Sequence, residues 1–96
     1  MRVVVKHPGE APVIEDIEEL EDVLGDAHHE AWTGDQATFH AMDAAVEYNL
    51  LAPVDYRLPI CGPVVAVPRG DHSAEMIRET LERYCNACSQ MTFTMN

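Results

Sequence analysis

Two cysteines near the carboxyl end form the pattern that most suggests chemistry. Cys85 and Cys88 have C-x-x-C spacing, in which two thiolates can chelate one zinc ion. A tetrahedral zinc site needs two further ligands, and Cys61 and His72 are the candidates. The structural alternative is that Cys88 packs as a small apolar residue on a helix while Cys85 stays half-exposed. We favour that alternative and keep a small zinc-binding protein as a competing hypothesis.

A dithiol redox role for the same pair is disfavoured by its position in the chain. Reactive thiolates favour the positive N-terminus of a helix, whereas these cysteines stand near the C-terminal end of a predicted one. The three cysteines are an odd number without framework spacing, so we expect free thiols in a reducing compartment. No apolar run approaches the roughly 20 residues of a membrane span, and we expect a cytoplasmic protein.

Histidines in the first half of the chain could bind metal or move protons. His28, His29 and Glu30 stand together, and His40 lies across a predicted hairpin, where it can share a face with His28. Adjacent strand residues point to opposite faces, so only one of His28 and His29 can join His40. We interpret these histidines as solvated strand residues.

Asp71, His72 and Ser73 have the residue types of a hydrolytic triad, but they are consecutive. A helix is predicted to begin here, so capping accounts for Asp71 or Ser73 without catalysis. The chain also lacks a Gly-x-Gly-x-x-Gly motif and a phosphate-binding loop. We therefore identify no catalytic residue, expect no cofactor, and favour a non-enzymatic role.

The composition is strongly acidic. Seventeen acidic residues against six basic ones give a formal net charge of -11, which repels nucleic acids and anionic membranes. The same field attracts a basic protein, or imitates the charge of DNA, although it could serve solubility alone. The predicted partner surface is the run of carboxylates Glu15, Asp16, Glu18, Glu19, Glu21 and Asp22.

The elements that position these groups begin with a buried strand at residues 3–5, which a turn at residues 7–9 ends. Residues 11–14 form a second short strand, and Pro12 places it at a sheet edge or a strand start. A capping box of Asp16 and Glu19 predicts a helix over 17–24, with Gly25 as its left-handed C-terminal cap.

A two-residue alternation from 28 to 42, interrupted at residues 33–35, predicts a hairpin with Trp32 and Phe39 as its heaviest apolar residues. Residues 43–51 are ambiguous, and residues 52–58 are expected to form a surface loop. The apolar run at 62–68 predicts a strand near the sheet centre.

Asp71 or Ser73 then begins a second helix. Its core-facing stripe is predicted to contain Met76 or Ile77, Leu81, Tyr84 and Cys88. Residues 89–96 form either an edge strand or a frayed tail.

Three segments together resemble a known family. They are the opening Arg2–Pro12, the acidic Ile14–Ile17 before a helix, and the late Ile60–Val67. In these the chain resembles the prokaryotic and phage family called domain of unknown function 3846. The likeness covers most of the chain but departs from the family at residues 43–58. It implies a small mixed domain of phages or mobile elements with no established activity, and supplies no site residues.

These observations predict one α+β domain over residues 1–96, a mostly antiparallel sheet of four to five strands packed against two helices. We expect an accessory or protein-interaction domain that binds another protein through its acidic surface or a sheet edge, and the negative field favours a basic partner. The alternatives are an acidic DNA mimic that inhibits a nucleic-acid enzyme, and the zinc protein of Cys61, Cys85 and Cys88.

Overall fold

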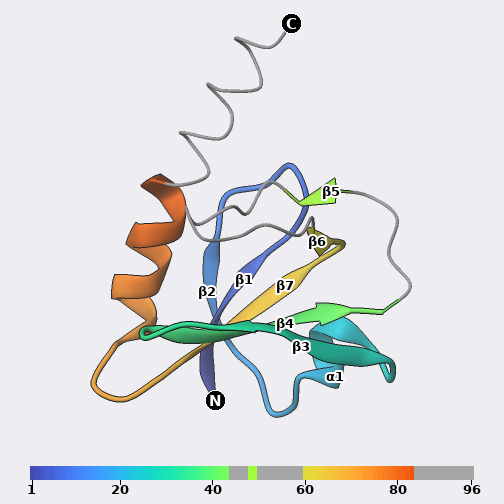
Figure 1. Ribbon diagram of the computed structural model, residues 1–96, viewed down its shortest axis with the longest axis horizontal. Coiled ribbons are helices and arrows are strands. Elements are labelled where there is room, and N and C mark those ends of the chain that lie inside the picture. Colours follow the sequence, from blue (N-terminus) through green and yellow to red (C-terminus); the bar gives the residue numbers. More distant parts are fainter. Residues whose placement is uncertain (44–47, 50–59, 84–96) are drawn as a thin grey trace, which may run out of the picture.

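A five-stranded antiparallel sheet, in the order β2-β1-β7-β4-β3, forms the centre of the fold (Figure 1). The computed structural model describes residues 1–43, 48–49 and 60–83. The sheet strands are β1 (Arg2–Lys6), β2 (Val13–Asp16), β3 (His28–Thr33), β4 (Ala37–Met42) and β7 (Val64–Pro68). A two-stranded sheet joins β5 (Tyr48–Asn49) to β6 (Ile60–Cys61), and the helices are α1 (Glu21–Leu24) and residues 74–83. The predicted α+β class is confirmed.

Strands β1 and β7 lie inside the sheet because their side chains are apolar on both faces. Val3, Val4 and Val5 are at most 1% exposed, as are Val64 and Val65. β-branched residues favour a pleated surface covered on both sides. The prediction that the 62–68 run lies near the sheet centre is therefore confirmed, and so is the edge position of β2, which starts directly after Pro12.

The two helices cover opposite faces of the sheet. One face contributes Val4 and Phe39 to a core that Ile77 and Leu81 of the 74–83 helix complete. The other face packs Val3, Val5 and Val65 against Leu24 of α1. Alternation of side chains along each strand separates the two cores, so each helix stabilises its own face.

The hairpin of β3 and β4 agrees with the prediction, with one irregularity. Its register shifts between Glu30 and Trp32, which is a β-bulge at Ala31. The bulge places Trp32 opposite Phe39, and their ring centroids lie 5.2 Å apart. Phe39 is buried and Trp32 is half-buried beside it, so both contribute to the same core as the 74–83 helix.

The first helix is much shorter than predicted. Ile17 and Met1 exchange backbone hydrogen bonds in both directions, which extends the β1–β2 ladder one pair beyond Asp16. Residues committed to a ladder cannot start a helix, so α1 is confined to Glu21–Leu24. The capping box predicted for Asp16 and Glu19 is therefore wrong. Gly25 does end the helix, but at φ 75° and ψ -173°, outside the left-handed helical region.

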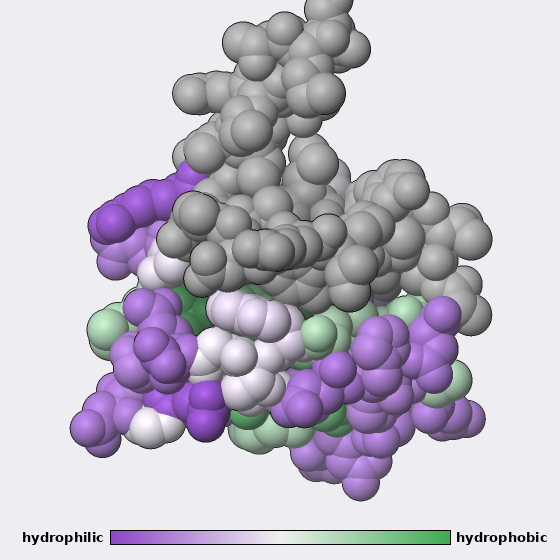
Figure 2. Space-filling view, in the orientation of Figure 1, coloured by the Kyte–Doolittle hydropathy of each residue, from purple (hydrophilic) through white to green (hydrophobic). Residues whose placement is uncertain are grey.

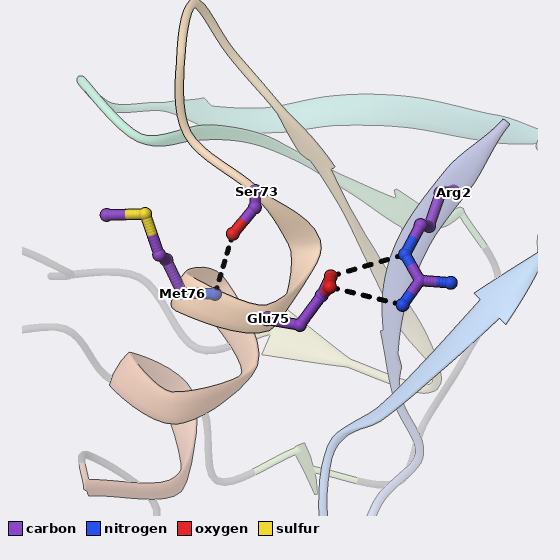
Figure 3. Close-up of polar contacts among 4 residues, drawn as sticks. All are labelled: Arg2, Ser73, Glu75 and Met76. Atoms are coloured by element: carbon purple, nitrogen blue, oxygen red, sulfur yellow. Dashed lines mark hydrogen bonds and ion pairs between the residues drawn. The ribbon is translucent and has the colours of Figure 1, made fainter.

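The second helix begins as predicted, and Ser73 is its cap (Figure 3). The Ser73 hydroxyl accepts a hydrogen bond from the Met76 amide at 3.2 Å. Glu75, in the first turn of the helix, accepts two hydrogen bonds from the Arg2 guanidinium, at 3.1 and 3.2 Å, and thereby ties the helix to β1.

The stripe on this helix consists of Ala74, Ile77 and Leu81, each buried, whereas Met76 is 48% exposed. Ile77 is therefore the core residue of the two that the sequence allowed. The predictions for Tyr84, Cys88, the 52–58 loop and the tail at 89–96 lie outside the described residues.

Candidate functional site

The acidic run follows the outer edge of the sheet and then turns into α1. Glu15 and Asp16 lie on edge strand β2, Glu18 and Glu19 lie in the connection, and Glu21 and Asp22 lie in α1. All six side chains are exposed. The predicted helix over 17–24 would have included Glu18 and Glu19, and this is wrong, because the ladder continues through Ile17 and α1 begins only at Glu21. In Figure 2, hydrophilic side chains occupy the margins of the described surface, with hydrophobic ones between them.

Two of the six carboxylates already have structural roles. The Asp22 carboxylate accepts hydrogen bonds from the amides of Glu18 and Glu19, at 3.2 and 3.1 Å, which fixes the turn before α1. Glu21 lies 3.0 Å from Nε2 of His28 on β3. The hydrogen bond with His28 lowers the pKa of Glu21, so this carboxylate holds α1 against the sheet as an anion.

The other four carboxylates form what we call the acidic edge: Glu15, Asp16, Glu18 and Glu19. Within the described residues, no hydrogen bond or ion pair engages the side chains of Glu15, Glu18 or Glu19. Hydrogen bonding and charge attraction with Glu75 raise the pKa of the Arg2 guanidinium, and Asp16, which stands opposite Arg2, adds a smaller contribution in the same direction.

Few cations are available to neutralise the acidic edge. Arg2 directs its hydrogen bonds to Glu75, and the sequence has no lysine or arginine between Lys6 and Arg57. The field of these carboxylates is therefore only weakly compensated by neighbouring side chains.

The histidines are arranged as the hairpin register predicted, but they are not all solvated. His28 and His40 share the α1 face with ring centroids 6.4 Å apart, while His29 is on the opposite face. The His28 side chain is only 18% exposed. Burial lowers the pKa of His40, with Glu30 opposing the shift. Solvated strand histidines were thus a correct prediction for His29 and a wrong one for His28 and His40.

The metal hypothesis depends on groups that the structure describes only in part. Nδ1 of His72 donates to the carbonyl oxygen of Arg69 at 3.0 Å. Cys85 and Cys88 lie outside the described residues, and Cys61 is described only as part of β6. Among residues 1–43, 48–49 and 60–83, no three metal-ligating side chains gather. The zinc site stays a prediction.

The sequence did not reveal that Lys6 is buried, at 3% exposure. Its ammonium group donates to the carbonyl oxygen of His7 at 2.8 Å. Lys6 pairs with Val64 at the end of β1, on the same face as Val4. The burial of Lys6 could have been predicted from strand alternation, because residues i and i+2 share a face and Val4 belongs to the predicted buried strand.

Comparison with known proteins adds no relative. No family model matches the chain, and no curated protein or solved structure is significantly similar to it. The resemblance to the domain of unknown function 3846 family therefore stays a prediction. In the described part of the chain, no helix has the length and apolar character needed to cross a membrane.

Proposed function

We propose that this chain is a non-enzymatic protein-interaction domain that binds a basic partner through its acidic edge. The observation that supports the proposal is that Glu15, Glu18 and Glu19 are exposed and have no hydrogen-bond or ion-pair partner among the described residues. Carboxylates that stabilise a fold are engaged by partners, as Glu21 and Asp22 are here. Unengaged carboxylates gathered on one edge are available to a cationic surface.

Electrostatics gives this interaction its range and its selectivity. At physiological ionic strength the Debye length is about 8 Å, so neighbouring carboxylates act together on an approaching cation. Such a field raises association rates with basic proteins and repels nucleic acids and anionic lipids. The partner is therefore a protein with clustered lysine or arginine side chains, and the resemblance stated above supports an accessory role in a phage or mobile element.

A matched pair of variants tests the proposal. The acidic-edge variant carries Glu15→Gln, Asp16→Asn, Glu18→Gln and Glu19→Gln. The control variant removes the same number of charges elsewhere on the exposed surface, by Asp35→Asn, Asp71→Asn, Glu79→Gln and Glu82→Gln. Both variants have the same net charge, so a difference between them reports position and not total charge.

The experiment is quantitative capture from a bacterial lysate at 50 and 300 mM salt, followed by mass spectrometry. We expect the wild type and the control to retain the same basic protein at low salt, and the acidic-edge variant to lose it. If this protein binds DNA and DNA displaces the domain from it, the partner is a nucleic-acid enzyme and the DNA-mimic form of the proposal holds. Equal capture by both variants would contradict the proposal.

A further inference from the structure

The backbone of β2 has hydrogen-bonding groups that point away from the sheet. Met1 and Ile17 exchange hydrogen bonds with each other, and bonded and non-bonded pairs alternate along an antiparallel ladder. Glu15 and Val13 therefore direct their backbone groups toward β1. The N–H and C=O groups of Ile14 and Asp16 point outward, and no described strand pairs with them.

The stretch of β2 with outward-pointing backbone groups has defined ends. Pro12 has no N–H, so the outward row of donors cannot continue past the start of β2. At the other end, the Glu18 amide already donates to Asp22. Along the described part of β2, the Ile14–Asp16 stretch is thus the part open to a further strand, and carboxylates border it on both faces of the sheet. Glu15 lies on the α1 face, and Asp16 lies on the face of the 74–83 helix.

We propose that the partner adds a basic extended segment to the sheet by pairing with Ile14 and Asp16 along the outer edge of β2. This inference rests on the proposed function and specifies how the partner binds. A strand beside β2 presents its side chains alternately to the two faces. Lysine or arginine on one face meets Glu15, and on the other face meets Asp16.

Charge excludes a second copy of this chain as the occupant. Pairing of β2 with its own copy would bring Glu15 and Asp16 of both copies together, with Arg2 already engaged by Glu75. Like charges directly opposite each other destabilise a strand pair. Charged residues and proline on an edge strand also prevent indiscriminate pairing, so a strand of opposite charge is selected.

The test uses a blocked heptapeptide in which lysine and valine alternate, and a control peptide of equal charge with a central proline. Binding is followed by the amide exchange of the whole 96-residue protein. At a free peptide concentration of ten times Kd, we expect exchange at Ile14 and Asp16 to slow about tenfold. Exchange at Val13 and Glu15, whose amides face β1, should change little. Proline should weaken binding, because it interrupts the new ladder.

The outcomes separate this inference from the proposed function. Alternation places all lysines of the peptide on one face, where they meet either Glu15 or Asp16. Glu15→Gln with Asp16→Asn should therefore weaken the alternating peptide by up to about fivefold, by removing one cross-strand charge pair. Strand addition is overturned if both peptides bind equally, depend on the same carboxylates and leave the amides of Ile14 and Asp16 unprotected. In that case the acidic edge still binds a basic partner, and the proposed function stands. If neither peptide responds to the carboxylates, both proposals fail. Protection of Ile14 and Asp16 in the free protein at high concentration would identify a second copy as the occupant and overturn the inference.

Discussion

Gly34 tests whether the packing of the hairpin core is as described. A Cβ atom built at Gly34 would lie 2.5 Å from Cη2 of Trp32 and 2.9 Å from Cζ3, whereas ordinary contacts begin near 3.4 Å. Gly34 is not among the glycines with positive φ, so an alanine backbone is allowed there. Alanine at this position would therefore act only by displacing the indole ring, by about 1 Å.

The expected cost follows from two opposing effects. Overpacking that displaces a ring from a well-packed site costs about 1–3 kcal/mol. Replacing glycine by alanine at a permissive position gains about 0.4–1 kcal/mol, because the unfolded chain loses conformational freedom. At the middle of these two ranges, Gly34→Ala should thus lower the free energy of unfolding by about 1.3 kcal/mol, and each kcal/mol corresponds to a fall in Tm of about 4–8 °C.

Urea unfolding followed by circular dichroism measures this change, and a double-mutant cycle isolates its cause. In a Trp32→Ala background, the obstructing ring is absent, so Gly34→Ala should be neutral or stabilise by up to about 1 kcal/mol. If Gly34→Ala were as stable as the wild type while Trp32 is present, the contact between the ring and the hairpin turn would be refuted. The contact would also be refuted if Gly34→Ala still lowered the free energy of unfolding in the Trp32→Ala background.

Three further predictions address the cap, the pH response and the cysteines. Ser73→Ala should lower the free energy of unfolding by about 0.5–2 kcal/mol in urea titration, because the Met76 amide loses its acceptor. Aspartate can also accept this hydrogen bond, so a Ser73→Asp variant that was no more stable than Ser73→Ala would contradict the capping role. Burial lowers the pKa of His40 below its usual 6.5, so the unfolded chain binds more protons than the folded chain, and the free energy of unfolding should fall as the pH drops below about 6.5. Urea titrations of His40→Gln should show a smaller loss of stability over that pH range. An equal loss would mean that other groups cause the pH dependence. Since the structural interpretation of the thiols is favoured, elemental analysis of untagged protein should find less than about one-tenth equivalent of zinc, whereas one full equivalent, lost on replacing Cys85 and Cys88, would establish the metal hypothesis.

The fold could be predicted from the sequence wherever a hydrophobic pattern allows a single arrangement of the strands or helix. The valines of β1 and the 62–68 run have no polar face, so they had to be inner strands. Alternation and turn residues likewise defined the hairpin, and Ser73 marked the start of the second helix.

The sequence-based prediction was wrong at the first helix, where a long-range contact outweighed a local preference. The capping box near Asp16 favoured a helix, but the ladder between Ile17 and Met1 held that segment extended. The same contact determines where the acidic edge lies, since it keeps Glu15 and Asp16 on a strand with an open side. Sequence identified the carboxylates, whereas strand pairing, which joins residues distant in sequence, determined their arrangement.

The most direct test of the central claim is a map of where a cation binds. In an NMR titration with the alternating lysine peptide, amide shifts should concentrate between residues 13 and 19 and decrease as salt is raised. Shifts centred instead on the carboxylates of the 74–83 helix, or spread evenly over the surface, would contradict the account.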